Sequence, residues 1–381
     1  PLPSKAEAKA MASAQSKGLV APLEDTFLLH SNPGSGQTLF LDFDGYSGYR
    51  GKAIGSWSID GDDTTFNAQE RTVIQETWFS VSEDFLPFNI DVTTEDPGVD
   101  PFVGHRAAVD GARRYTYSWA YGGDWCDMTN RYAYIFPGPD TWLWIADSVS
   151  HEVGHTLNLG HDGRGGQEYY TGHGSGATEW CPIMGWGAYS LNVWSKGDYN
   201  GATRPNQDDL AVIDAVCGVD YRVDDHGNNI ASATSMSLPA TLSFAAEGII
   251  ERTTDVDYFA FSTTGGQTQF SINEDVTLGA CNLDVLAKIH DNTGAVLYTS
   301  NPVNGIHASF DVFLNAGDYY LSIDGTGMGD PWTDPPSGYS DYGILGYYSI
   351  LAMGLSGADE TPPNPDPMIW ASAPAAGGSV D

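Results

Sequence analysis

Three histidines within eleven residues, His151, His155 and His161, constrain the fold of this chain more than any other feature. The apolar residues of the segment 141–157 recur at helical spacing on one face, which predicts an amphipathic helix. Side chains four residues apart share a face of a helix, so His151 and His155 present two imidazoles to one point beside it. We therefore expect one side of the helix to be buried and the histidines to face a cleft where a metal ion fits.

The third histidine requires a sharp turn directly after this helix. Asn158 and Gly160 tolerate the left-handed backbone that such a turn needs. With His161 brought back to the other two, three neutral imidazoles leave tetrahedral Zn²⁺ one open position, which is the pattern of a catalytic site. Glu152, next to the first ligand, is placed to hydrogen-bond a water molecule there and accept its proton.

The run of residues 151–162 resembles the signature of the metzincin zinc peptidases, His-Glu-x-x-His-x-x-Gly-x-x-His. A His-acid-x-x-His arises by chance about 0.03 times in a chain of this composition, so the match is specific. Members of the family also carry a methionine turn, and Met184 lies 23 residues after His161 in the segment Cys-Pro-Ile-Met-Gly-Trp. The resemblance implies that Met184 forms an apolar floor beneath the zinc histidines.

Two positions depart from the common family pattern. Asn158 stands where most members have Gly, but Asn is the next most tolerant residue of left-handed geometry, so we expect the turn to form. Trp186 stands two residues after the methionine, where some groups have a tyrosine, so a tyrosine switch is not supported. Tyr189 and Trp186 are the candidate substrate or transition-state contacts, with a structural role for Tyr189 as the alternative. Asp162 is similar to the acidic residue of the adamalysin-like (reprolysin) group and would support the turn from outside the metal site.

The resemblance implies an α+β metzincin-like catalytic domain with a mixed sheet, a zinc helix and a methionine turn. A capping box of Asn67 and Glu70 predicts a further helix, which Pro87 stops. By analogy with the family, residues 132–136 form the strand that pairs with an extended substrate. The predicted strands are residues 38–45, 89–94 and 132–136, and residues 206–213 are predicted to form a capped helix that closes the domain.

Beyond residue 220 the sequence changes to short alternating runs separated by Gly, Asn and Asp turns, which is typical of strands. Roughly eight strands in about 130 residues predict an all-β sandwich. Segments such as 254–259 and 338–343 resemble the bacterial pre-peptidase C-terminal domain, which accompanies secreted peptidases. We expect four parts: an N-terminal extension or propeptide remnant (1–36), the zinc metallopeptidase domain (37–218), the sandwich (222–355), and a Pro-rich linker with the start of a truncated further module (356–381).

The chain is strongly acidic, with 16 basic and 50 acidic residues and a formal net charge of −34. Phosphate repels such a surface, so nucleic acid is not an expected partner. The sequence contains no apolar run long enough to span a membrane, and we expect a monomer secreted by a bacterium. The aspartates of the C-terminal half are either a solvated surface that tolerates salt or sites for Ca²⁺.

Four cysteines allow three pairings, and an exported protein is expected to oxidise some of them. The sequence does not reveal which pair forms, although one disulfide within the catalytic domain is expected and Cys181 is placed to brace the methionine turn. A zinc-thiolate role is less favoured, because three histidines complete a catalytic set. The four are Cys126, Cys181, Cys217 and Cys281.

These features predict a secreted zinc-dependent endopeptidase that acts on protein or peptide substrates, with Glu152 as the general base. A different class of function is a secreted protein that binds glycans or proteins and whose zinc domain is inactive. A narrower version of the endopeptidase hypothesis is a peptidase restricted to glycoprotein substrates. The intact Glu152 argues against an inactive zinc domain.

Overall fold

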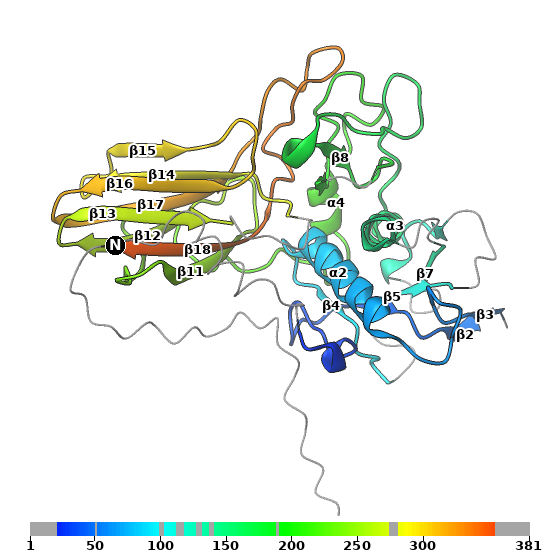
Figure 1. Cartoon of the computed structure of the whole chain (residues 1–381). Coiled ribbons are helices and arrows are strands. Elements are labelled where there is room, and N and C mark those ends of the chain that lie inside the picture. The colour runs from blue at the N-terminus through cyan, green and yellow to red at the C-terminus, as the bar shows by residue number, and fades with distance from the viewer. Residues whose placement is uncertain are drawn as a thin grey trace, which may run out of the picture.

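The computed structural model describes residues 21–49, 52–98, 103–111, 118–126, 132–136, 141–187, 190–273 and 281–354. Two parts lie side by side in it (Figure 1). One contains helices α2 and α3 with strands β1 to β7, and the other contains the long strands β11 to β18. Residues 1–20 of the expected N-terminal extension (1–36) and the whole expected C-terminal segment (356–381) lie outside the described residues.

A five-stranded sheet forms the centre of the first part, in the order β4-β1-β5-β7-β6. Its strands pair in parallel except β6, which is antiparallel to β7. The central strands are buried on both faces, as covered parallel strands are. Their bounds are β1 Thr38–Asp42, β4 Asp91–Thr93, β5 Gly104–Val109, β6 Trp119–Ala120 and β7 Tyr132–Ile135.

Helices α2 (Ala68–Phe85) and α3 (Trp142–Thr156) pack against each other and against this sheet. The predicted capping box is confirmed: the Asn67 side chain accepts from the Glu70 N–H, and the Glu70 carboxylate accepts from the Asn67 N–H at 2.8 Å. The predicted helix that carries the histidines is confirmed as α3. Ser150 of α3 donates a hydrogen bond to Asp84 of α2 at 2.5 Å, which joins the two helices.

Strand β7 does not lie at the edge of the sheet. It pairs with β5 on one side and β6 on the other, so the prediction that residues 132–136 receive a substrate strand is wrong. Among the described strands β6 is the last on this side, and its two residues give no alternating pattern in the sequence. Trp119 and Ala120 are thus the strand residues that lie beyond β7, near α3.

Short elements complete the first part. The predicted closing helix is found as α4, which begins later than expected because Asp208 is its N-cap and accepts from the Ala211 N–H. The remaining elements are η1 Leu23–Asp25, β2 Tyr46–Tyr49, β3 Lys52–Ile54, η2 Asp124–Cys126, η3 Gly176–Thr178, β8 Trp180–Pro182, β9 Leu191–Val193 and α4 Asp209–Asp214.

Two sheets make up most of the second part, with strand orders β10-β12-β17-β14-β15 and β11-β18-β13-β16. Their strands pair antiparallel except β10, which is parallel to β12. Along β12, β13, β14 and β18 buried residues alternate with partly exposed ones, so each sheet turns one apolar face inward. This arrangement is consistent with the predicted β-sandwich. The strands are β10 Thr234–Ser235, β11 Ser243–Ile250, β12 Asp257–Thr263, β13 Gly266–Ile272, β14 Val285–Asp291, β15 Val296–Ser300, β16 Ala308–Leu314, β17 Gly317–Gly325 and β18 Gly346–Gly354.

The predicted fold class, an α+β metzincin-like catalytic domain, is wrong for this chain. The described residues are mostly β-sheet, and their three α-helices have only 18, 15 and 6 residues. Local helical signals at residues 67–87 and 141–157 were extended to a whole domain by analogy, whereas strands and irregular segments occupy most of the chain between them. A β-sandwich is the fold element with which the structure is consistent.

The two parts are joined by hydrogen bonds that are buried or partly buried. Asn282 donates to Asp84 at the end of α2 at 2.8 Å, and the Tyr342 hydroxyl donates to Asp208 at 2.6 Å. The backbone oxygen of Gly338 accepts from His173 Nε2 at 2.8 Å. The long segment between β17 and β18 therefore lies against the loops that follow the histidine helix. None of the helices in the described part of the chain has the length and apolarity needed to cross a bilayer.

Candidate metal centre

The structure brings the three predicted histidines together. His151 and His155 project from α3, and His161 returns after the turn so that one ring nitrogen from each lies within 4.8 Å of the others. The Nε2 atoms of His155 and His161 are 3.0 Å apart. Three nitrogen donors converging at this spacing fit a tetrahedral Zn²⁺ with one position left open.

The other nitrogen of each ring is fixed by a hydrogen bond. His151 Nδ1 donates to the Ile183 carbonyl at 2.8 Å, and His155 Nδ1 donates to the Leu159 carbonyl at 2.9 Å. His161 Nδ1 donates to the Glu168 carboxylate at 2.7 Å. These bonds set the ring orientation and the tautomer, so each Nε2 is left as the lone-pair donor toward the common centre.

The surroundings keep His151 and His155 uncharged, which is the form that binds metal. Burial, with the adjacent His155, lowers the pKa of His151 to about 3. Burial also lowers the pKa of His155. These two rings therefore do not have to lose a proton before a cation binds.

Glu152 lies beside the histidines and is largely buried, with 7% of its surface exposed. Burial raises the pKa of its carboxyl group to about 8, although a hydrogen bond from the Ala120 N–H acts in the opposite direction. A carboxylate with a raised pKa accepts a proton more readily than an ordinary one. The contact also links Glu152 to strand β6.

The turn between the helix and the third histidine forms as predicted at Asn158, whose φ of 73° lies in the left-handed region. Gly160 has a different role from the one expected, because it is not among the residues with positive φ. A Cβ at Gly160 would lie 2.4 Å from Cζ of Arg204, so a side chain there would displace the Arg204 guanidinium. Arg204 Nε in turn donates to the His161 carbonyl at 3.0 Å, which holds the ligand loop.

Met184 is fully buried under α3, in the position of the expected apolar floor. Its Sδ would lie 2.4 Å from a Cβ at Gly154, so the methionine packs directly on the helix backbone between His151 and His155. The Met184 carbonyl accepts from the Asp162 N–H at 2.7 Å. This bond ties the methionine turn to the residue that follows the third histidine.

Asp162 is almost fully buried, and its backbone makes the contacts that support the turn. Burial raises the pKa of its carboxyl group to about 7, against the lowering effect of Arg204. Its Oδ2 atom is buried without a hydrogen-bond partner. The expected supporting role of Asp162 is thus carried by its main chain.

Aromatic residues line one side of the three imidazoles. The Tyr169 ring lies 4.2 Å from His161 and 6.1 Å from Trp186, measured between centroids. Trp186 itself is 60% exposed, which leaves its ring accessible to a substrate. Tyr189 lies outside the described residues. The sequence pattern did not single out Tyr169 or Glu168, because both lie in an irregular loop with no periodicity.

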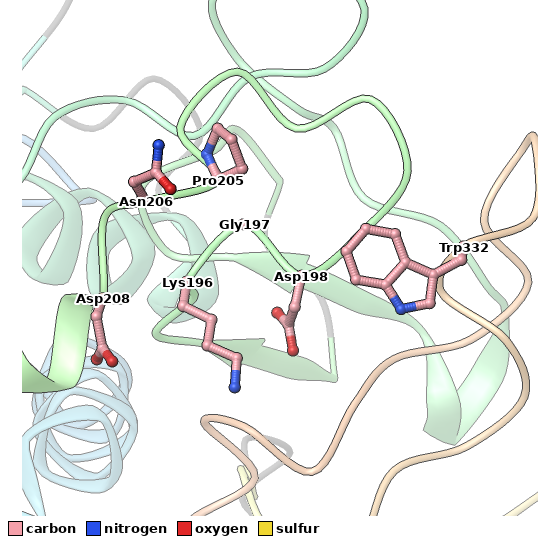
Figure 2. Close-up of a pocket in the computed structure, with 7 residues that line it drawn as sticks. All are labelled: Lys196, Gly197, Asp198, Pro205, Asn206, Asp208 and Trp332. Atoms are coloured by element: carbon pink, nitrogen blue, oxygen red, sulfur yellow. The ribbon is translucent and has the colours of Figure 1, made fainter.

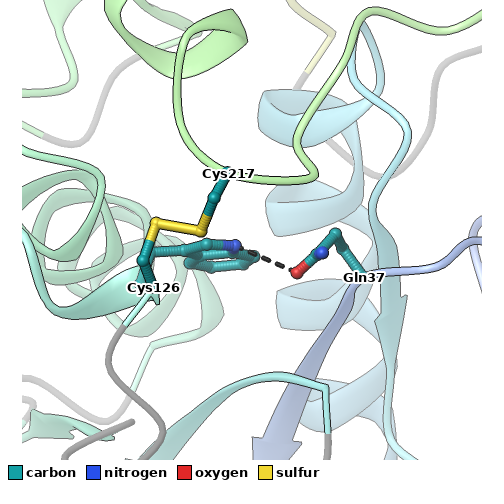
Figure 3. The surroundings of a disulfide bond; sticks show 4 residues. Gln37, Cys126 and Cys217 are labelled. Atoms are coloured by element: carbon teal, nitrogen blue, oxygen red, sulfur yellow. Dashed lines mark hydrogen bonds between the residues drawn. A yellow bond between two sulfur atoms is a disulfide. The ribbon is translucent and has the colours of Figure 1, made fainter.

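Among the described residues one disulfide is present, between Cys126 and Cys217. Figure 3 shows it beside Gln37, whose side-chain oxygen accepts from Trp125 Nε1 at 3.1 Å. Cys181 and Cys281 are free and buried, so the suggestion that Cys181 braces the methionine turn through a disulfide is wrong. The bridge instead ties residues near β6 to the segment after α4.

Comparison with known proteins gives one distant relative by sequence. Over 181 residues the chain is 28% identical to the metallopeptidase AprA of Pseudomonas marginalis. The match covers 41% of this chain and 35% of that protein, so the chain matches only about a third of its relative's length. No protein-family model matches the chain. A metallopeptidase is therefore a distant homologue, and a protease-related function is the most that this relationship supports.

Solved structures resemble only about a third of the chain. The pre-peptidase C-terminal domain of a Bacillus anthracis collagenase aligns with 33% of this chain and 99% of its own length, at 15% identity and a TM-score of 0.23. PliG of Salmonella Typhimurium, a periplasmic inhibitor of g-type lysozyme, aligns with 32% and 98%, at 14% identity and a TM-score of 0.19. At these TM-scores neither likeness bears on function.

Proposed function

We propose that this protein is a secreted zinc-dependent endopeptidase. The observation that carries the proposal is the set of three histidines whose Nδ1 atoms are each bound to an acceptor, which leaves three ring nitrogens directed to one centre beside a buried glutamate. The distant relationship to a metallopeptidase agrees with this chemistry. His151, His155 and His161 would hold the zinc ion.

Zinc bound there supplies Lewis acidity, which polarises a carbonyl group and lowers the pKa of a water molecule. Glu152 accepts a proton from the attacking water on a carboxylate oxygen and transfers it to the nitrogen of the departing amine. Since Glu152 is buried, bulk water does not compete for that proton. The Ala120 N–H keeps the carboxylate oriented.

The substrate backbone would lie near β6. This two-residue strand is the last of the described strands on that side of the central sheet, and Ala120 contacts the proposed base directly. An extended peptide that lies alongside it brings its carbonyl groups close to Glu152. Trp186 supplies an exposed aromatic surface beside Tyr169.

The site, taken by its motif alone, supports a metzincin of the adamalysin-like group. The spacing of the three histidines, Asn158 in left-handed geometry and Met184 beneath the helix are the supporting features. We also propose the division into residues 1–36, 37–218, 222–355 and 356–381. The sequence landmarks of residues 222–355 support a pre-peptidase C-terminal domain and, with it, export from a bacterial cell.

Hydrolysis of an unstructured protein such as casein tests this function. Activity should be lost on treatment with a chelator and restored by zinc, and Glu152→Gln should bind zinc while losing most turnover. Zinc binding without any cleavage would favour a binding protein with an inactive zinc domain. A matched control is Glu247→Gln, since Glu247 lies on β11, outside the metal centre.

We propose in addition that Ca²⁺ binds a cluster of acidic side chains at the start of the sandwich, apart from the three histidines. Oxygens of Asp224, Glu251 and Asp255 lie within 4.8 Å of one another, as do those of Asp224, Asp225 and Asp257. One carboxylate oxygen on each of Glu251, Asp255 and Asp257 is buried without a hydrogen-bond partner. Buried, unpaired carboxylate oxygens at this spacing suit a calcium ion, which takes oxygen ligands.

The neighbouring charges favour a cation at this position. Burial and the nearby aspartates raise the pKa of Asp257 to about 8. Added Ca²⁺ should therefore raise the unfolding temperature of the protein, and Asp257→Asn should remove most of that increase. An unfolding temperature that does not respond to millimolar Ca²⁺ would exclude this site.

A further inference from the structure

A pocket of about 320 Å³ lies where the loop after β9 meets the segment between β17 and β18. Figure 2 shows Lys196 and Asp198 extending to the same side of the loop, with the Trp332 indole beyond Asp198. Pro205, Asn206 and Asp208 form the remaining wall, together with the backbone of Gly197. The pocket is separate from the three histidines and takes no part in the chemistry proposed above.

The polar groups of this pocket are held in place. Asp198 accepts a hydrogen bond from the Ser340 hydroxyl through Oδ2, and Asp208 accepts from the Tyr342 hydroxyl through Oδ1. Lys196 Nζ lies 4.6 Å from the centre of the Tyr342 ring, within cation–π distance. Each anchored group still has hydrogen-bonding capacity to offer a ligand: one oxygen on each carboxylate and the ammonium protons.

Trp332 presents an exposed aromatic surface from a fixed backbone. Its backbone is fixed on both sides, because its N–H donates to Asp330 at 2.9 Å and its carbonyl accepts from Asn200 at 2.8 Å. Its side chain nevertheless remains 60% exposed. An indole held at the surface next to acids, an amide and an ammonium group presents a flat apolar face surrounded by hydrogen-bonding groups.

The charges of the pocket argue against an anionic ligand, because an anion would meet Asp198, Asp208 and the net charge of −34. The Lys196 ammonium beside the two carboxylates gives the pocket both donors and acceptors, which a ligand with hydroxyl groups satisfies. A purely apolar ligand would leave these polar groups without partners. A pyranose ring is neutral, has one face of C–H bonds that packs on an indole, and carries hydroxyl groups at its edge that both donate and accept.

We propose that this pocket binds a neutral sugar residue of a glycan attached to the protein substrate. The volume is sufficient for one or two pyranose rings. The sugar stacks on Trp332 while its hydroxyl groups bond to Asp198, Asn206 and Lys196. The sugar would select glycoproteins as substrates, and this part of the inference rests on the proposed peptidase function.

The position of the pocket suits an exosite for such substrates. Asn206 and Pro205 directly follow Arg204, which holds the carbonyl of the third histidine. Gln207, next in the chain, bonds both the N–H and the carbonyl of Gly160 at 3.1 Å. A glycan in the pocket would thus be bound on the same loop that supports the metal centre.

Sugar binding is tested with the zinc-loaded Glu152→Gln protein, which binds without cleaving. Mannotriose and chitotriose are titrated by calorimetry, with a sulfated heparin tetrasaccharide as the anionic probe. At least one neutral trisaccharide should bind and the sulfated one should not. Trp332→Ala should weaken binding at least tenfold and Asn206→Ala severalfold. Phe313→Ala, which removes a similarly exposed ring from β16, should not change the affinity for the sugar.

The substrate role is tested with the active protein. The ratio of kcat/KM for a glycoprotein to that for its deglycosylated form should exceed one, should fall toward one in Trp332→Ala and should persist in Phe313→Ala. Failure of both neutral sugars to bind, or binding that survives Trp332→Ala, overturns the inference. Sugar binding without cleavage of any protein would leave the pocket assignment standing and refute the peptidase function.

Discussion

The Glu168 carboxylate accepts a hydrogen bond from His161 Nδ1 at 2.7 Å, seven residues after the histidine that it orients. The other two imidazoles are held by backbone carbonyls, so this is the one ring among the three whose orientation depends on a side chain. A carboxylate in this position also makes the imidazole a stronger donor to the metal.

Glu168→Ala should therefore weaken zinc binding by about 10-fold to 100-fold. Competition with a chromophoric chelator measures the change directly. Glu179→Ala is the matched control, because Glu179 also lies in the loop after the third histidine and has no contact with the three rings. Equal zinc affinity in the Glu168 variant and the unaltered protein would show that the bond does not orient His161.

Gly154 should not tolerate a side chain. An alanine Cβ there would lie 2.4 Å from Met184 Sδ and 3.2 Å from the Trp194 ring. Overpacking of this kind costs about 1–3 kcal/mol and outweighs the gain of about 1 kcal/mol in helix propensity. Thermal unfolding of Gly154→Ala should show a lower midpoint, whereas Gly36→Ala, which adds a Cβ to open space, should not. An unchanged midpoint in Gly154→Ala would mean that Met184 moves aside freely.

The Cys126–Cys217 bridge closes a loop with a sequence separation of 91 residues. A cross-link over a long loop restricts the unfolded chain, so the double variant Cys126→Ser, Cys217→Ser should lose about 2–5 kcal/mol of stability. Denaturant unfolding measures this loss. Reductant should destabilise the unaltered protein and leave the double variant unchanged; a response of the variant to reductant would point to a different bridge.

His30 makes the stability depend on pH in the mildly alkaline range. Hydrogen bonds to Asp91 and Glu95, at 2.7 and 2.8 Å, raise its pKa to about 8. The folded-state pKa is above the unfolded value, so this stabilisation is full below about pH 6.5 and is lost as the pH rises through 8. Because Glu95 is 45% exposed, solvent screening leaves about 1 kcal/mol.

The free energy of unfolding, measured from pH 6 to pH 9 for the unaltered protein and for His30→Gln, checks this dependence. The difference between the two proteins should shrink toward the alkaline end. A constant difference across that range would show that His30 contributes through packing and not through its charge.

The sequence predicted the parts of the candidate site that depend on local spacing. Residues four apart on a helix must share a face, so the pairing of His151 with His155 follows from the pattern itself. The turn at Asn158 follows from the short distance between the helix and His161. Both predictions depend on fewer than a dozen neighbouring residues, and the structure has both features.

Features that depend on distant segments were not predictable in this way. Gly154 packs on Met184, thirty residues later, and Gly160 on Arg204, so neither contact is visible along the chain. The substrate strand was assigned to residues 132–136 by analogy with the family, and β6, with two residues, leaves no pattern that could have corrected this. The α+β fold class was inferred from a motif of twelve residues, and a motif that fixes a site does not fix the architecture around it.

The central claim is that three imidazoles hold a catalytic zinc ion, and zinc X-ray absorption of the metal-loaded protein tests it most directly. The account predicts that the zinc ion has three imidazole nitrogens at about 2.0–2.1 Å and one further ligand atom, an oxygen or a nitrogen. Sulfur at about 2.3 Å, or a chain that takes up no zinc, would contradict it.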